Sequence, residues 1–447
     1  MMKRSAWRYL WKSEDIRKKI LITLALLMIY RIAAHIPVPG INPNVLAQLT
    51  QRTDATGNLI ALLNLLSGGT VARFSVLAMG VYPYITAQII LQLLAPIIPA
   101  LDRKLKENPR GGQKWMEKWT VILTVPMALL SAVGQIQIFN SLAGGGSVLF
   151  KFGFTADTWL PTVTSLLSMM AGTMFGIWVG QLISEYGIPN QGLSLIIFAG
   201  IVSQIPSNLG GILSDQQSGW WLTLIILAIL GLTIFAIVFV QQGRRNVPVL
   251  FPGRRVGNRM SMPVRSNLPL MVNMAGMIPL IFAQSILTFP AIVSSYFVNS
   301  STQWVSDIAW GIYRTFGGGS PVYSILYFVS VVLFTFFYTD VLFANQNYGD
   351  NLKKQGAQIP GVVRGAATQK YLTRVQRRIT FPGALFLGIV AVLPYVLSNF
   401  LPAATHAGLF LLSSAGLLIV VGVVRDTFTI IETELKVHGY DESLIKG

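Results

Sequence analysis

Residues 59–99 read LIALLNLLSGGTVARFSVLAMGVYPYITAQIILQLLAPIIP. The first apolar run, Leu59–Leu66, would extend about 12 Å as a helix, far less than the roughly 30 Å hydrocarbon core of a membrane. The segment Ser67-Gly68-Gly69-Thr70 then interrupts the pattern, because paired glycines favour turns. The second run, Phe74–Ile98, is long enough to cross a membrane as one helix.

The short run therefore predicts a half-helix that enters the membrane and returns without crossing it. Irregular backbone at that depth is tolerated only where it is buried in protein or lines a water-filled cavity. We therefore expect a re-entrant helix beside a cavity, and a cavity in a membrane protein indicates passage of a substrate.

The composition places the chain among polytopic helical membrane proteins. It has 447 residues, of which 53% are hydrophobic and 11% are charged. The absence of cysteine excludes a disulfide framework, Cys-ligated zinc, iron–sulfur clusters and thiol nucleophiles. The basic N-terminus lacks a cleavage-type segment, so we expect the first span to remain as an anchor.

Hydropathy predicts ten membrane spans. They cover residues 20–36, 74–98, 119–139, 159–182, 192–211, 220–241, 269–297, 321–343, 380–400 and 406–424. The expected fold is all-α, with two five-helix halves at 1–211 and 212–447 around a central pathway. Such a division often reflects an inverted repeat. Comparison of the two halves reveals no convincing similarity, so the repeat is an expectation from the number of spans.

The basic residues predict the orientation. Of the 34 Lys and Arg residues, 29 lie in the termini and in the loops on the same side, whereas four lie on the opposite side. Because Lys and Arg accumulate in cytoplasmic loops, both termini are expected to be cytoplasmic.

Two of the cytoplasmic loops are unusually basic. Residues 242–268 contain six arginines, no lysine and no acid, and residues 344–379 contain seven basic residues against the single acid Asp350. The simpler explanation of this charge is the positive-inside rule alone. The length of the loops and the choice of arginine favour a docking surface for RNA or an acidic protein.

The spans lack the side chains that ion-coupled solute transport or catalysis usually requires. Ion-coupled transporters place acids or histidines inside their spans, and here Asp340 is the exception in spans that contain almost no acid. No paired catalytic groups, metal-ligand spacing or Walker A motif occurs, and no cofactor is expected. A gated channel is therefore favoured over the alternatives, an ion-coupled secondary transporter of a small solute and an intramembrane hydrolase.

Seven segments spread over the chain together resemble the SecY/Sec61-alpha family, the channel-forming subunits of protein translocases. They are RIAAHIPVPGIN (31–42), LLSGGTVARFSVLAMGVYPYITAQIILQLL (65–94), GTMFGIWVGQLISEYGIPNQGLSLIIFAGIV (172–202), LPLMVNMAGMIPLIFAQSILTFP (268–290), FFYTDVLF (336–343), NLKKQGAQIPG (351–361) and GLLIVV (416–421).

The resemblance implies an hourglass pore with four functional parts. A plug of about residues 59–73 would include Leu59, Leu62, Leu63, Leu66, Ser67, Gly68 and Gly69. The aliphatic ring at the waist would be Val81, Ile85, Leu193, Ile197, Ile281 and Ile419. The polar side chains of a lateral gate would be Thr86, Gln88, Gln92, Asn273, Gln284, Ser285 and Thr288. Partner docking would use Arg244, Arg245, Arg254, Arg255, Arg259, Lys353, Lys354 and Arg364.

Each of these roles has a simpler alternative. The plug segment could be an amphipathic loop helix, the ring residues could be ordinary helix packing, and the gate residues could be static hydrogen bonds between helices. Arg364 matches a loop arginine of the family, although relatives read PGxRPG and this chain has one residue more, in PGVVRG at 360–365.

The resemblance also implies partners and location. These are the small membrane subunits SecE and SecG, the motor ATPase SecA, the ribosome, signal peptides, nascent chains and lipids. The expected location is the bacterial inner membrane. The cargo would be unfolded secretory chains, whose hydrophobic segments leave sideways into lipid, and a partner would supply the energy.

Overall fold

A computed structural model describes residues 13–50, 70, 73–95, 98, 101, 109–142, 148–150, 152–153, 155, 157–203, 205–206, 220–252, 255–256, 259–260, 264–298, 302–316, 320–400 and 414–437. The helices before the central hairpin are α2 (Glu14–Ala33), α3 (Pro43–Thr50), α5 (Tyr82–Leu94), α7 (Pro109–Leu142), α8 (Trp159–Tyr186), α9 (Gly192–Val202) and α11 (Trp220–Gln242). The strands are β1 (Arg244–Phe251), β2 (Arg255–Val256), β3 (Arg259–Met260) and β4 (Val264–Met271). The helices that follow are α12 (Ile278–Phe297), α13 (Gln303–Phe316), α14 (Pro321–Gln346), α15 (Tyr348–Lys354), α16 (Ala366–Phe400) and α18 (Ser414–Val437).

Each of the ten predicted spans contains a helix. Among the described residues, four segments are long and apolar enough to cross a membrane: Lys114–Gln137, Trp159–Tyr186, Pro321–Lys354 and Ala366–Leu393. Shorter apolar helices run over Gly192–Val202, Leu227–Gln242 and Ile278–Ala291. The expected all-α architecture is therefore confirmed, and the number of ten crossings stays a prediction.

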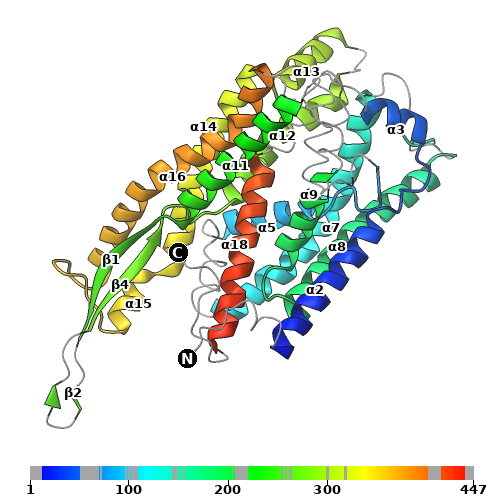
Figure 1. Cartoon of the computed structure of the whole chain (residues 1–447). Helices are drawn as coiled ribbons and strands as arrows, with labels where there is room; N and C mark the ends of the chain where they lie inside the picture. The colour runs from blue at the N-terminus through cyan, green and yellow to red at the C-terminus, as the bar shows by residue number, and fades with distance from the viewer. Residues whose placement is uncertain are drawn as a thin grey trace.

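The helices of the two ends of the chain meet in the middle of the molecule. In Figure 1, α2, α7 and α8 lie on one side and α12, α14 and α16 on the other, with α9 and α18 between them. The last helix, α18, packs against α9 from the first half and against α11 and α16 from the second. The region between the halves is thus built from segments far apart in the sequence.

One end of the molecule collects the basic loops. Lys19 near the start of α2 pairs with Glu434 near the end of α18, and Arg425 donates to the carbonyl of Gln241 at the end of α11 over 3.2 Å. The β1–β4 hairpin projects from this end, whereas α3 and α13 lie at the opposite end (Figure 1). We call this the basic end, and its position agrees with the predicted alternation of loops.

The expected helix over 74–98 is wrong at its start. Phe74 has a φ of 44°, which disfavours helix for a bulky residue. Its carbonyl accepts from the N–H of Val38, and the N–H of Val76 donates to the carbonyl of Ile36. The helix begins only at Tyr82, after Gly80 with a φ of 53° and with Pro83 in its first turn.

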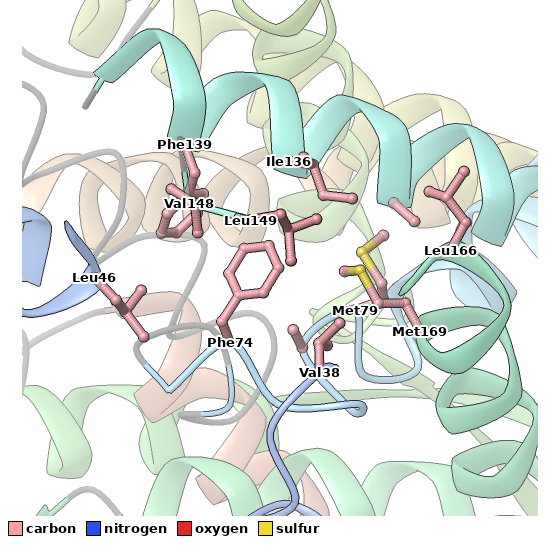
Figure 2. Close-up of a cluster of buried hydrophobic side chains, with 12 residues drawn as sticks. Val38, Leu46, Phe74, Met79, Ile136, Phe139, Val148, Leu149, Leu166 and Met169 are labelled. Carbon is pink, nitrogen blue, oxygen red and sulfur yellow. The ribbon is translucent and has the colours of Figure 1, made fainter. Parts of the chain in front are cut away.

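The irregular segment before α5 is enclosed by protein. Phe74 is fully buried, and its ring meets Phe139 of α7 edge-on, with centroids 5.3 Å apart. Figure 2 shows Phe74 among side chains from α3, α7 and α8 and from the Val148–Leu149 segment. This burial satisfies the requirement that irregular backbone at membrane depth be covered.

The expected span over 269–297 is also wrong at its start. Residues up to Met271 belong to β4, and α12 begins at Ile278, after Gly276 with a φ of 64° and with Pro279 in its first turn. The N–H of Val272 donates to the carbonyl of Gly243 over 2.9 Å. The described residues of the loop 242–268 therefore include a folded hairpin, because β1 and β4 pair in antiparallel register from Arg244–Met271 to Phe251–Val264.

Other boundaries differ because hydropathy detects only the apolar part of a helix. Helix α9 ends at Val202, where Ser203 forms a turn, and Ile205 and Pro206 are helical again, so the predicted span over 192–211 is interrupted after Val202. Helix α16 begins at Ala366 rather than 380, and α18 continues to Val437 rather than 424. Helix α13 was not expected, and it exposes Trp304 and Trp310 at the end opposite the hairpin.

Candidate functional site

The predicted plug residues lie outside the described part of the chain. They are Leu59, Leu62, Leu63, Leu66, Ser67, Gly68 and Gly69. Thr70, the first described residue after them, is buried, and its hydroxyl donates to the carbonyl of Leu77 over 2.8 Å. This bond fixes Thr70 to the irregular segment that leads into α5.

Five of the six predicted ring residues belong to one aliphatic cluster. They are Val81, Ile85, Leu193, Ile197 and Ile419. Val81 precedes the first turn of α5, Ile197 lies on α9 and Ile419 lies on α18. Val81, Ile197 and Ile419 are at most 8% exposed, whereas Ile85 and Leu193 are partly buried. Residues more than 300 positions apart in the sequence, such as Val81 and Ile419, therefore lie in one packed cluster.

The sixth ring residue, Ile281, lies in the neighbouring cluster. That cluster joins Ile89 of α5 to Ile281 and Phe282 of α12 and to Tyr338 of α14. Ile85 and Met277 pack against both clusters, so the two are continuous. The described aliphatic side chains of the predicted ring therefore lie in two adjoining packed clusters.

The starts of α5 and α12 repeat one another in sequence. Gly80-x-x-Pro83 corresponds to Gly276-x-x-Pro279, and in this register Ile85 falls on Ile281. The same register aligns further identical residues: Ala87 with Ala283, Gln88 with Gln284, Leu91 with Leu287 and Ala95 with Ala291. Both aligned glycines have positive φ, and Ala87 and Ala283 are both fully buried.

The packing around these starts repeats as well. A Cβ added to Gly172 of α8 would lie 2.1 Å from the carbonyl oxygen of Val76, four residues before Gly80. A Cβ added to Gly383 of α16 would lie 2.8 Å from the carbonyl oxygen of Val272, four residues before Gly276. Comparison of the whole halves misses this similarity, whereas alignment on the two Gly-x-x-Pro motifs reveals it.

The helices that carry the predicted lateral-gate residues meet through apolar contacts. Helices α7 and α12 pack together, and Ile89 of α5 packs against Ile281 and Phe282. The hydroxyl of Thr86 donates to the carbonyl of Tyr82 in its own helix, over 3.1 Å. Gln88 and Gln92 are partly buried and make no side-chain hydrogen bond with any described residue. The polar bonds expected across this seam are therefore not formed by these side chains.

Asn273 is the most unusual polar residue at the seam. It is 4% exposed and lies in the irregular segment before α12. Its Nδ2 donates to the carbonyl of Gly276 over 3.1 Å, while its Oδ1 is buried without a hydrogen-bond partner among the described residues. An unpaired buried acceptor is unfavourable by about 1–3 kcal/mol. Gln284 is also buried, and Ser285 and Thr288 lie on α12, where the structure describes their backbone only.

The two basic loops form one folded unit at the basic end. Leu250 of β1 and Gln358 exchange two backbone hydrogen bonds, of 2.8 and 2.9 Å. Beneath them lies a separate apolar core, formed by Val247, Val249, Leu270, Phe343, Leu352, Ala357, Ile359, Leu372 and Val375. We call this unit, residues 243–251, 264–272 and 348–375, the platform. Loops that only carried positive charge would not need an apolar core of their own.

The predicted docking residues lie on this platform or beyond it. Arg244, Arg245, Lys353, Lys354 and Arg364 are exposed. Arg255 and Arg259 lie in the short strands β2 and β3, with only their backbone described, and Arg254 lies outside the described residues. The sequence held a signal for the hairpin, because the alternation of Val247 and Val249 with polar or exposed residues has the period of a strand.

Comparison with known proteins identifies the family. A model of the SecY family matches residues 75–428. The protein translocase subunit SecY of Streptomyces galbus is 35% identical over 445 residues, covering 98% of this chain and 99% of the relative. The same subunit from Pseudomonas aeruginosa is 39% identical over 427 residues, covering 94% of this chain and 91% of the relative.

Two solved structures share the fold. One, described as a protein conducting channel, has a TM-score of 0.59 at 16% identity and covers 97% of this chain and 98% of its own. The other, from work on the plug domain of the SecY protein and the closed state of the translocation channel, has a TM-score of 0.58 at 17% identity with the same coverage. The fold expected from the sequence is thus confirmed, and the transporter alternative finds no support in these matches.

Proposed function

The chain belongs to the SecY family, and on that premise we propose that it is the central subunit of a protein-conducting channel. It would move unfolded secretory polypeptides across the membrane and release hydrophobic segments sideways into lipid. The observation that carries this proposal is the aliphatic cluster in which Val81, Ile197 and Ile419 meet.

The cluster suits a gate for an extended chain of varied sequence. A narrow apolar constriction excludes water and ions by dewetting. Aliphatic side chains also offer a passing polypeptide no hydrogen bond to hold it. The plug, Leu59–Gly69, would close the same opening from the outer side, and the buried Thr70 would retain its end when it moves.

The seam between α5/α7 and α12 is the proposed lateral gate. Its contacts are apolar, so a signal sequence can replace them with similar contacts of its own. A hydrophobic segment would then leave for lipid, since transfer of each Leu, Ile, Phe or Val is favourable by roughly 0.3–0.6 kcal/mol. Gln92, Asn273 and Thr288 are the proposed polar positions along this path.

The two halves, 1–211 and 212–447, are the proposed moving units. The repeated starts of α5 and α12, each packed on a glycine of α8 or α16, support an inverted repeat. Helices related in this way can separate symmetrically about the ring.

The platform is the proposed docking site for the partners that drive transport. Its exposed arginines and lysines suit acidic protein and ribosomal RNA, which in this family means the SecA motor and the ribosome. SecE and SecG are the proposed small membrane subunits. The proposed location is the bacterial inner membrane, with the platform and both termini in the cytoplasm.

A reconstituted transport assay tests the function. Vesicles containing the full chain with its small subunits would receive the motor, ATP and a precursor with a signal sequence. We expect the precursor to become protected from added protease, and a precursor without the signal sequence to stay accessible. Ion-coupled uptake of a small solute without precursor protection would instead support the transporter alternative.

A further inference from the structure

One side of helix α13 is fixed against the rest of the protein, at the end opposite the platform (Figure 1). Ala309 is buried, and Tyr313 packs against the cluster that contains Phe74. Phe316 packs against the cluster that contains Tyr323 of α14. Because these three residues of α13 recur at a spacing of three or four positions, they define a single buried side of the helix.

The start of α13 is also tied to the end of α12. The hydroxyl of Ser306 donates to the carbonyl of Val298 over 2.6 Å. The carbonyl of Thr302 accepts from the N–H groups of Val305 and Ser306, both over 3.1 Å, and the two helices pack together. The rotation of α13 about its own axis and its position beside α12 are therefore set by contacts within the chain.

A second side of α13 carries an exposed apolar row. Trp304, Ile308 and Ile312 are 67%, 56% and 37% exposed. They lie four residues apart, so their side chains form one row along the helix. Since the buried side fixes the rotation of α13, this row points away from the described part of the protein.

The third side of α13 is polar. Gln303, Asp307 and Arg314 are exposed, and at the helical repeat they lie within about 40° of one another around the axis. Trp310 borders this side, and its ring meets Tyr313 edge-on, with centroids 5.9 Å apart. A helix whose exposed surface divides into an apolar row and a polar side is typical of the boundary between hydrocarbon and water.

The apolar row of α13 begins close to the end of a similar row on α12. That row is 40–60% exposed, lies within the predicted span 269–297 and consists of Ile286, Phe289, Val293 and Phe297. In a membrane protein, an exposed apolar row on a spanning helix faces lipid. It ends at Phe297, next to Val298, whose carbonyl accepts from Ser306 of α13. The surface that faces lipid on α12 therefore leads directly to α13.

We propose that α13 lies in the surface of the membrane leaflet at this end, with lipid as its partner. Trp304, Ile308 and Ile312 would enter the boundary between headgroups and acyl chains, while Asp307 and Arg314 would stay in water. Recognition is apolar and needs no particular headgroup. The proposal requires only that the chain span a membrane, so it does not depend on transport of polypeptides.

The size of the row favours lipid over another protein as the occupant. A stable protein interface buries about 800 Å² on each partner, whereas a large aromatic side chain such as Trp304 supplies roughly 150–250 Å². Three side chains in one row are therefore too few for a stable protein interface. Tryptophan is also enriched where membrane meets water, because its ring is apolar and its N–H can donate to the headgroup region.

Spin labels on single cysteines test the proposal, because the chain has no cysteine of its own. The stripe variants are Trp304→Cys, Ile308→Cys and Ile312→Cys, and the matched variants on the polar side are Asp307→Cys and Arg314→Cys. Each labelled full chain would be reconstituted with its small subunits into dioleoylphosphatidylcholine vesicles. Relaxation of the label by oxygen, which concentrates in hydrocarbon, is then compared with relaxation by a water-soluble nickel chelate.

The ratio of oxygen to nickel accessibility should be severalfold higher at the three stripe positions than at Asp307 and Arg314. Two reference positions set the scale. Phe289→Cys on the exposed row of α12 reports lipid, and Arg244→Cys on the hairpin reports water. The stripe should give ratios below that of the Phe289 position, since an interfacial helix enters the membrane by only roughly 5–10 Å.

Three results would overturn the proposal. Stripe labels that match the Arg244 position would place the row in water. Low accessibility to both reagents at all three stripe positions would show that protein covers the row, either a second copy of the chain or a small subunit. Ratios equal to that of the Phe289 position on both the stripe and the polar side would place the whole helix within the hydrocarbon.

Discussion

Leu250 and Gln358, which lie in two separate basic loops, pair through both of their backbone hydrogen-bonding groups. This pair extends the hairpin to a third segment and closes the platform above its apolar core. The arginines of one loop and the lysines of the other therefore move as one body, which a partner can bind as a single surface.

The first prediction concerns this pair. Leu250→Pro removes the N–H that Gln358 accepts, and loss of one such bond in a partly buried ladder should destabilise the platform by about 1–3 kcal/mol. Limited proteolysis should then cut the 344–379 region faster. Leu250→Ala keeps the N–H and serves as the control, and equal cutting of the two variants would contradict the role of the hydrogen bond.

The second prediction concerns the close contact of α8 with the irregular segment before α5. Gly172→Ala would place a Cβ 2.1 Å from the carbonyl oxygen of Val76, and overpacking of this kind is destabilising by about 1–3 kcal/mol or more. The midpoint of thermal unfolding in detergent should fall.

Gly231 supplies the matched control for that substitution. It lies in α11 with no atom within 4 Å of an added Cβ. Gly231→Ala should leave stability unchanged or raise it by about 0.5–1 kcal/mol, because alanine favours helix. A fall of the same size in both variants would contradict the packing argument.

The third prediction concerns the aliphatic ring. Ile85→Ser places a hydroxyl in the constriction, so the gap should admit water more readily and resting ion conductance in planar bilayers should rise at least about twofold. Ile286→Ser, on the exposed side of α12, makes the same change away from the ring. The ring assignment fails if conductance is the same in the two variants.

The fourth prediction concerns partner docking. Arg364 is exposed at the edge of the platform, and Arg364→Glu should slow motor-driven export severalfold without lowering the unfolding temperature. Arg314→Glu reverses an exposed charge at the opposite end, on α13, and should have no effect. Normal export by the Arg364 variant would reject its docking role.

The fifth prediction concerns the lateral gate. Because the chain has no cysteine, Gln92→Cys provides a single thiol, and it should crosslink to a signal sequence that carries a thiol-reactive group during transport. Leu232→Cys, on a strongly exposed face of α11, should crosslink far less. Crosslinking at Leu232 but not at Gln92 would reject the seam between α5/α7 and α12.

Comparison of the predicted and observed elements shows where sequence reasoning failed. Hydropathy extended the second span back to Phe74, because the residues from Phe74 to Val81 are as apolar as those of a membrane-spanning helix. The motif Gly80-x-x-Pro83 marks the true start, since glycine adopts positive φ and proline suits a first helical turn. The same motif at Gly276 marks the start of α12, and both signals were present in the sequence.

The amino-acid sequence by itself determined the class of protein, the order of its apolar helices, the interruption after Leu66 and the gathering of basic residues in two loops. These are local properties, set by the length of apolar runs, by glycine and proline, and by the count of charges. Only the tertiary structure decided which aliphatic side chains meet at the ring, how Gly172 and Gly383 receive the irregular segments, and that Leu250 pairs with Gln358. Those relations join residues up to hundreds of positions apart, and they depend on packing that no local pattern encodes.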